Sequence, residues 1–185
     1  MENVKNSYFN IAAKWAVIYT ITSIIIVYIF QFTGIDMNTS PLKYVSFIFT
    51  ILFIFLAQKE YRDQLGGFMN FGQGFMVGFI SSVIVGVLSA IFIYIYYTFL
   101  SPQIWEQTLA SSRQQLESQG LSSDQIDKGM EITAKYGVVI AAVATIFVSP
   151  IIGAIVSLIG AAIFKKERTI EDIEKETPSF PDATV

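Results

Sequence analysis

The chain of 185 residues contains no cysteine and no histidine. Without cysteine there is no disulfide framework and no thiolate nucleophile, and nothing indicates the redox compartment. Without histidine the usual general base and the usual metal ligand are absent, which excludes a Ser-His dyad and the H-E-x-x-H zinc motif. We therefore predict no catalytic residue, no cofactor-binding residue and no metal site, and we expect a protein that is not an enzyme.

Charged residues are scarce as well. They make up 15% of the chain against 53% hydrophobic residues, and they stand in clusters between long apolar blocks. A soluble domain of this size scatters its charges, so the pattern predicts a membrane protein surrounded by lipid. The formal net charge of −3 is small and lies partly in the C-terminal tail, which argues against a nucleic-acid partner.

Four apolar blocks are candidates for transmembrane helices. A helix rises 1.5 Å per residue, so about 20 residues cross a hydrocarbon core of about 30 Å. The first block is longer than the apolar region of a signal peptide and lacks a cleavage site, so we expect it to be retained. The second block is the shortest, and Leu42 with the stems of Lys43 and Lys59 can extend it to a span rather than a re-entrant segment. The predicted spans are 15–35, 42–58, 73–100 and 137–164.

Basic residues predict the orientation of these spans. Lysine and arginine concentrate in cytoplasmic loops, so the more basic side is expected to face the cytoplasm. The larger basic group lies on the side of both termini and comprises Lys5, Lys14, Lys59, Arg62, Lys165, Lys166 and Arg168. The smaller group comprises Lys43, Arg113, Lys128 and Lys135. We therefore predict cytoplasmic termini, with non-cytoplasmic connections at 34–43 and 101–136.

Small residues recur at every fourth position in the third span. On a helix they form one slowly winding ridge, where another helix backbone can approach closely. The same spacing recurs in the fourth span. We predict that the two rows pack against each other within one chain; the alternative is a homodimer or a partner's span on the first row. The first row is Gly74, Gly78, Ser82, Gly86 and Ala90, and the second is Gly153, Ser157 and Ala161.

Pro150 lies near the middle of the fourth span. Because proline lacks an amide proton, it is predicted to kink the helix and to free the carbonyl of Ile146. The apolar blocks hold none of the ionisable groups that proton-coupled transporters keep inside the bilayer. Hydroxyl side chains are present, and we interpret them as hydrogen-bonded to helix carbonyls rather than as nucleophiles. They are Ser81, Ser82, Ser89, Thr145, Ser149 and Ser157.

The connection 101–136 is the only sizeable polar segment. Ser101 and Pro102 predict an N-cap and the first residue of a helix that ends at Gly120. Ser122 and Gln125 predict a capping box that opens a second helix running into the fourth span. We expect a hairpin whose apolar stripe rests on the bilayer or on the spans; the alternative is a docking surface for a partner. The stripe consists of Ile104, Trp105, Leu109 and Leu116.

A short turn motif joins the second and third spans. Its glycine pair Gly66-Gly67 permits positive φ and a tight reversal. The motif lacks the Lys-Ser/Thr ending of a phosphate-binding loop, so we predict a cytoplasmic turn. The motif residues are Tyr61, Arg62, Gly66, Gly67, Gly72 and Gln73.

This turn motif, the Asn-Phe-Gly-Gln-Gly run at 70–74, and the Ser-Pro pair after a tyrosine-rich helix end resemble a family of four-span bacterial membrane proteins, domain of unknown function 4199. The resemblance extends from the first span to Lys166. It implies a multi-pass protein of the bacterial inner (cytoplasmic) membrane with no assigned reaction. Members are often encoded near a membrane-associated glycosyltransferase, which implies an accessory role in envelope glycan assembly.

The expected fold is all-α: a four-span domain over 1–168, with a helical extracytoplasmic connection between spans three and four. Residues 169–185 are expected to form an acidic, solvated cytoplasmic tail. We expect a non-catalytic accessory or scaffold subunit of an envelope membrane complex, bound to a membrane-protein partner or forming a homo-oligomer. The alternative is a small transporter or channel-like protein whose substrate site lies at the Pro150 break and the hydroxyls near it.

Overall fold

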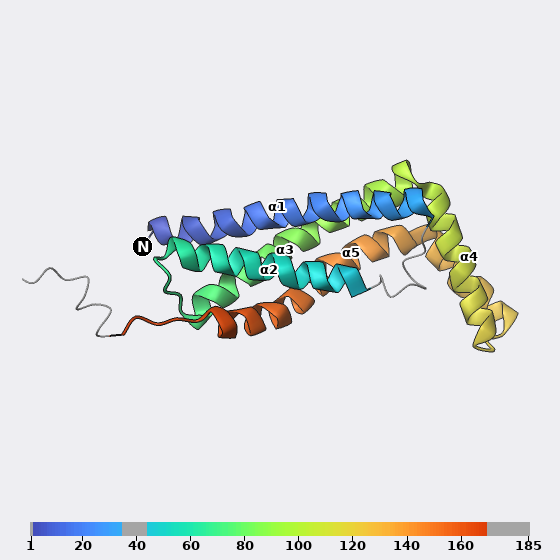
Figure 1. The fold of residues 1–185 in the computed structure, drawn as a ribbon. Helices are drawn as coiled ribbons and strands as arrows, with labels where there is room; N and C mark the ends of the chain where they lie inside the picture. Colours follow the sequence, from blue (N-terminus) through green and yellow to red (C-terminus); the bar gives the residue numbers. More distant parts are fainter. Residues whose placement is uncertain (1, 35–43, 170–185) are drawn as a thin grey trace, which may run out of the picture.

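The computed structural model describes residues 2–34 and 44–169. Over these residues the chain is helical and contains no β-strand, so the all-α prediction is confirmed (Figure 1). One isolated antiparallel bridge pairs Met69 with Lys166. The helices are α1 (Glu2–Thr33), α2 (Val45–Gln64), α3 (Phe71–Ile95), the π-helix η2 (Tyr96–Leu100), α4 (Pro102–Ser118) and α5 (Ser123–Phe164). The predicted connection 34–43 and the tail beyond Thr169 fall largely outside the described residues.

Within residues 2–34 and 44–169, three helical segments are long and apolar enough to cross a membrane: Tyr8–Thr33, Phe71–Leu100 and Ser123–Phe164. The first is most of α1, the second is α3 with η2, and the third is α5. Helix α2 is not among them, since charged residues fill its last turns. They are Lys59, Glu60, Arg62 and Asp63. These apolar helices are those of a membrane protein, with three candidate spans.

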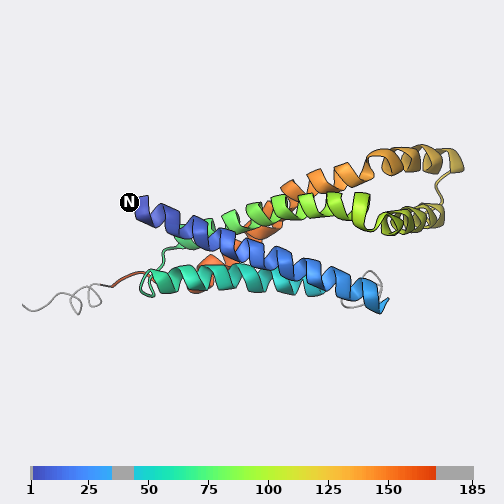
Figure 2. The ribbon, with the colours of Figure 1, turned by 90° about the horizontal axis from the view of Figure 1, so that it is seen from above.

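The four long helices form one elongated bundle. Helix α3 packs most extensively against α5 and also contacts α1 and α2, while α2 contacts α1 and α5 as well. Figure 2 shows α1 crossing α3, and the α1–α2 pair separating from the α3–α5 pair toward the end where α4 lies. We call this the α4 end. The opposite end, where the α2–α3 turn, the start of α1 and the end of α5 meet, is the turn end (Figure 1).

Large apolar side chains cover the outside of the bundle. A water-soluble monomer rarely exposes so much contiguous apolar surface, whereas lipid-facing helices do so over their whole length. The most exposed positions on α1 and α5 include Ile21, Ile25, Ile29, Phe32, Ile140, Phe147, Ile151, Ile155, Ile159 and Ile163. The buried core is built instead from small residues and from one cluster near the turn end, formed by Ile11, Ala57, Tyr61, Met69 and Val77.

Helix α4 turns away from the long axis of the bundle, and the first part of α5 runs back beside it (Figure 1). Gly120, with φ +77°, lies in the turn between them. Helix α5 continues without interruption from Ser123 to Phe164. The second helix of the polar connection and the fourth predicted span are therefore a single helix, as the capping pattern at Ser122 predicted.

Candidate functional site

The structure brings the two rows of small residues together at the α3–α5 contact. A Cβ added at Gly78 would collide with the hydroxyl of Ser157, and one at Gly153 would collide with Ser82. At Gly74 an added Cβ would lie 3.2 Å from the Cα of Ala161. The backbones of α3 and α5 are thus close enough that no Cβ fits at Gly78 or Gly153, and the contact at Gly74 is tight.

Toward the α4 end, the first row meets a residue that was not in the second row. A Cβ at Gly86 would lie 3.1 Å from the Cβ of Ser149 and 3.5 Å from the carbonyl oxygen of Ile146. The carbonyl that Pro150 leaves without its helical donor therefore faces the bare backbone of α3. Ala90 is buried at the end of the row. The predicted kink stays a prediction, since α5 is continuously helical through Pro150.

Hydrogen bonds also cross this contact. Ser157 Oγ donates to the carbonyl of Phe75 at 2.8 Å, and Ser149 Oγ donates to the carbonyl of Ser82 at 3.1 Å. Each serine thus serves as both a small packing residue and a hydrogen-bond donor between spans. Such interhelical bonds contribute roughly 0.6 kcal/mol each on average inside a membrane.

Gln58 of α2 is a polar residue that the sequence analysis noted only as the end of an apolar block. Its side chain is completely buried. Its Nε2 donates to the carbonyl of Gly74 at 3.0 Å and to the carbonyl of Ser157 at 2.9 Å, so it joins α2, α3 and α5. Gly160 leaves room for it, because a Cβ there would collide with the amide oxygen. The available signal was an amide at the last position of the second predicted span, next to Ala57.

The predicted turn motif divides into a turn and a packing cluster. Gly66 and Gly67 have φ of +76° and +87°, and the amide of Gly67 donates to the carbonyl of Arg62 at 2.9 Å, which ends α2. Asn70 then caps α3. Its Oδ1 accepts from the Gln73 amide at 2.9 Å, and Gln73 Oε1 accepts from the Asn70 amide at 3.0 Å. The chain thus reverses tightly and enters α3 with both cap bonds made.

The remaining motif residues pack. Tyr61 is fully buried and contacts the ring of Tyr8 edge-on, with ring centroids 6.4 Å apart. Burial raises the pKa of the Tyr61 phenol, which keeps it neutral. The guanidinium carbon of Arg62 lies 5.5 Å from the ring centre of Phe164. Gly72 has no comparable contact, since a Cβ there would meet only Asn70 Oδ1 at 3.6 Å.

The segment after α5 lies against this turn. Met69 and Lys166 exchange backbone hydrogen bonds of 2.8 and 2.9 Å. The Lys166 ammonium and the Arg168 guanidinium lie 5.0 and 5.1 Å from the centre of the Phe68 ring. These contacts hold the basic end of the predicted fourth span beside the α2–α3 connection.

Glu60 connects α1 to α2 at the turn end. It forms an ion pair with Lys14 and accepts a hydrogen bond from the indole Nε1 of Trp15 at 2.7 Å. Sequence analysis used Lys14 only as a basic boundary residue. The missed signal was Glu60 itself, a carboxylate just after the apolar part of α2, which can pair with a lysine just before the apolar part of α1.

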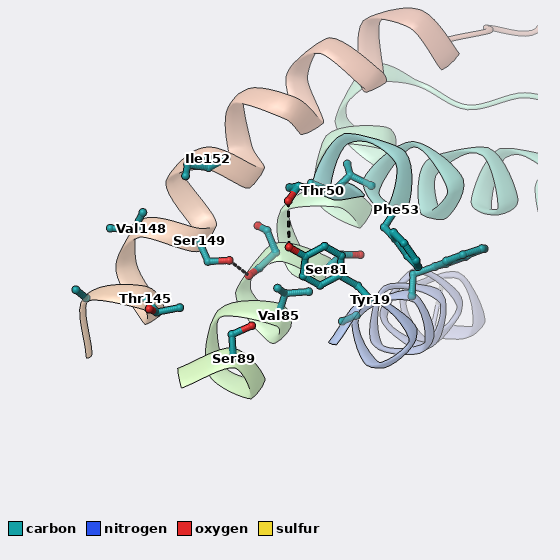
Figure 3. Close-up of a pocket in the computed structure, with 15 residues that line it drawn as sticks. Tyr19, Thr50, Phe53, Ser81, Val85, Ser89, Thr145, Val148, Ser149 and Ile152 are labelled. Atoms are coloured by element: carbon teal, nitrogen blue, oxygen red, sulfur yellow. Dashed lines mark hydrogen bonds between the residues drawn. The ribbon is translucent and has the colours of Figure 1, made fainter. Parts of the chain in front are cut away.

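A cavity of about 340 Å³ lies where α1, α2, α3 and α5 meet (Figure 3). Five of the six hydroxyl residues singled out from the sequence line it, and Ser157 is the exception, because it is enclosed in the α3–α5 contact. The lining residues are Trp15, Ala16, Tyr19, Thr50, Phe53, Ile54, Ser81, Ser82, Val85, Ser89, Ala144, Thr145, Val148, Ser149 and Ile152. None of them carries a charge.

Most of these hydroxyls already donate to the protein. Ser81, Ser82 and Thr145 donate to the carbonyls of Val77, Phe79 and Ala141 at 2.8, 2.7 and 2.8 Å. The interpretation as carbonyl-bonded hydroxyls is confirmed at these positions. Figure 3 shows the bond from Ser149 to α3 and the 3.1 Å contact between the hydroxyls of Tyr19 and Thr50. The cavity wall is therefore less polar than its composition indicates.

A second cavity of about 210 Å³ lies between α1 and the end of α3, and shares Ser89 with the first. It is lined by Thr20, Ser23, Ile24, Val27, Ser89, Phe92, Ile93, Tyr96 and Tyr97. Beyond it the hydroxyl of Tyr96 donates to Gln31 Oε1 at 2.9 Å, and Gln31 Nε2 contacts Ser101 Oγ at 3.2 Å. This network joins the end of α1 to the π-helix.

The polar connection has the predicted start, with Pro102 in the first turn of α4, but Ser101 makes no side-chain cap bond. The predicted stripe residues of α4 are partly buried, and Trp105 lies against Gly137, where a Cβ would collide with the indole ring. Arg113 Nη2 and Asp127 Oδ1 are 2.6 Å apart, and this bond raises the pKa of Arg113. The stripe therefore faces α5 of the same hairpin.

The candidate functional features of this structure are its packing surfaces and its cavities. Within residues 2–34 and 44–169, no cluster of three or more metal-ligating side chains is placed to hold a metal ion. No curated protein and no solved structure matches the chain. A family model does match it, over residues 14–166, from the start of the cavity-lining part of α1 to the bridge after α5. The chain therefore belongs to the family described as protein of unknown function (DUF4199).

Proposed function

We propose that this chain is a four-span protein of the bacterial cytoplasmic membrane, with both termini cytoplasmic, and that it acts as a non-catalytic scaffold in an envelope membrane complex. The observation that carries the scaffold role is the α4–α5 hairpin, which projects from the end of the bundle as a braced structure (Figure 1). A glycosyltransferase is the partner that the family resemblance favours.

Helix α2 is the fourth span in this proposal. Support comes from its packing, since it contacts α1, α3 and α5 and buries Gln58 among them. Its first half also exposes apolar side chains as the candidate spans do, at Phe47, Ile48, Ile51 and Leu52. With α2 spanning, the charged residues from Lys59 to Asp63 lie at the turn end together with Lys14 and Lys166.

The orientation can be measured directly because the chain has no cysteine of its own. Single cysteines at Asp63 and at Ser122 report on the turn end and on the α4 end. An impermeant maleimide is expected to label Ser122→Cys in intact spheroplasts and Asp63→Cys only in inside-out vesicles. Labelling of both positions from the same side contradicts the four-span topology.

The hairpin is suited to hold a partner because its own contacts fix its shape. Ile126 is 3% exposed beneath α4, and the Arg113–Asp127 bond joins the two helices. No residue of α4 is fully buried, so nearly all of its polar surface faces outward. Ile132 and Tyr136, one turn apart on α5, remain exposed beside it. A rigid surface binds with less loss of conformational entropy than a mobile loop.

The test is extraction of the full chain from source membranes in mild detergent. We expect a partner at stoichiometric amount that is lost with Ile132→Glu and retained with Lys128→Glu, a charge change on an exposed position of the same hairpin. If no partner survives extraction of the unaltered chain, or if both variants retain it equally, the scaffold proposal is wrong.

The larger cavity favours a second candidate, a small transporter. Thr145 and Ser149 line it immediately before Pro150, where sequence analysis placed a substrate site. The lining carries no charged residue. If this candidate is right, proteoliposomes of the pure protein take up uncharged polyols faster than empty vesicles, and Val85→Trp abolishes the difference. Equal rates with and without protein contradict transport of such solutes.

A further inference from the structure

We propose that the two neighbouring cavities bind the hydrocarbon chain of a membrane lipid. This binding site is independent of the scaffold role and of the hairpin. Neither cavity was foreseen as a lipid site, since sequence analysis placed only a transport substrate near Pro150. The lining chemistry, the shape and the depth of the cavities each favour a lipid chain.

The chemistry of the wall selects an apolar occupant. The hydroxyl protons of Ser81, Ser82, Thr145 and Ser149 are all donated to backbone carbonyls of the protein. A polar solute entering this cavity would therefore lose its hydrogen bonds to water and find few donors in return, a costly exchange in an apolar environment. A chain of methylene groups loses nothing by the same transfer.

The shape of the paired cavities selects a linear occupant. They share Ser89, and along α1 they extend from Trp15 to Val27. That stretch of thirteen residues contains twelve helical rises and corresponds to about 18 Å of helix. One leaflet of the hydrocarbon core is about 15 Å thick, so the paired cavities have the length of one lipid chain.

The position of the larger cavity gives the bilayer access to it. On α3 its lining runs from Ser81 to Ser89, the middle of the candidate span Phe71–Leu100. On α5, Val148 lines the cavity and is 49% exposed, so the cavity borders an accessible part of the α5 surface. Figure 3 shows Val148 and Ile152 on α5, with Tyr19 and Phe53 on the opposite side of the cavity. In this proposal a lipid chain enters past Val148 of α5.

The energetic reason is packing. Lipid outside the protein is as apolar as lipid inside the cavity, so the hydrophobic effect contributes little. An empty cavity, however, leaves its lining atoms without dispersion partners, whereas a lipid chain supplies them. Because the bilayer surrounds the protein with lipid, even a weak preference keeps the cavities filled.

The test uses the full chain in vesicles of phosphatidylethanolamine and phosphatidylglycerol, with a minor fraction of chains carrying a mid-chain diazirine. After illumination, mass spectrometry locates the crosslinks. We expect crosslinks at Tyr19, Val85 and Phe92 in the cavities, in addition to those at outward-facing Phe147. With Ser89→Phe, which places a ring at the residue that lines both cavities, crosslinks at the three cavity residues are expected to fall roughly tenfold while those at Phe147 stay unchanged.

The matched control is Val87→Phe, which adds a ring to the exposed face of the same helix and is expected to leave the cavity crosslinks unchanged. Ala144→Trp, at the α5 wall, is a second way to fill the larger cavity and serves if Ser89→Phe does not yield folded protein. Crosslinks confined to outward-facing residues, or cavity crosslinks that persist with both filling variants, overturn the proposal. Saturation of the cavity by an added polyol at the expense of lipid also overturns it and supports a transported solute.

Discussion

Helix α3 has two very different faces. Toward α5 it presents Gly74, Gly78 and Gly86, and a Cβ added at Gly78, or at Gly153 on α5, would collide with a serine of the other helix. Toward α1 the contact is broken by two cavities that together extend over more than half of the helix. One face lets backbones meet, and the other leaves space between side chains. The contrast indicates that the α3–α5 pair is the rigid part of the bundle, and that the α1 side is where a second molecule can be held.

The largest effect is expected from enlarging the tight face. Gly78→Leu together with Gly86→Leu should prevent α3 and α5 from approaching, at a cost of more than about 3 kcal/mol, which is enough to lose folded protein. Size-exclusion chromatography in detergent measures the folded monomer. Gly129→Leu, in the hairpin with nothing within 4 Å of its Cβ position, is the matched control and should fold normally. A folded monomer that has lost only an assembly would mean that the row serves an interface between chains.

Gln58→Leu should have the next largest effect on stability, because it removes the amide that joins α2 to α3 and α5. Two backbone carbonyls lose a donor, and interhelical bonds of this kind contribute roughly 0.6 kcal/mol each on average. We expect thermal unfolding in detergent at a lower temperature, whereas Gln64→Leu at the exposed end of α2 should leave it nearly unchanged. An unchanged unfolding temperature for Gln58→Leu would show that α2 is held by apolar packing alone.

Glu60→Gln tests how strongly the contacts of Glu60 hold α1 against α2. The Lys14 side chain is 48% exposed, so solvent screens the ion pair and the loss should stay below about 1 kcal/mol. The hydrogen bond to Trp15 should weaken at the same time, which shifts the tryptophan fluorescence. Glu167→Gln, which removes only an exposed pair with Lys165, should change neither quantity. A loss as large as that of Gln58→Leu would mean that the α1 attachment is as rigid as the α3–α5 contact.

The smallest effect on stability is expected from Ser89→Phe, although it adds nearly as much volume as a glycine-to-leucine change on the opposite face. Both cavities border this position and can accommodate the ring, so the free energy of unfolding should change by less than about 1 kcal/mol. Chemical denaturation in detergent measures it. Unfolding as severe as that of the Gly78 and Gly86 double variant would erase the difference between the two faces of α3.

Much of the fold could be predicted from patterns within one segment. The every-fourth spacing from Gly74 to Ala90, the Gly66-Gly67 reversal and the start of a helix after Ser122 each depend on residues near one another in the chain, and helix periodicity or turn chemistry makes them visible. Gln58 and Glu60 could not be assigned in this way. Their partners lie 16 to 99 residues away in sequence, and nothing in a single sequence gives the register between two helices.

The sequence by itself determined that this protein is helical, that apolar helices long enough to span a membrane dominate it, and that charge is kept to the ends, because these properties follow from composition and period. Only the tertiary structure decided which faces meet. The α3–α5 contact closes because glycine and serine on both helices come into register, and the cavities exist because α1 crosses α3 at an angle and leaves side chains unpaired. Relative placement of helices depends on the shapes of both surfaces at once, and that is a property no single segment carries.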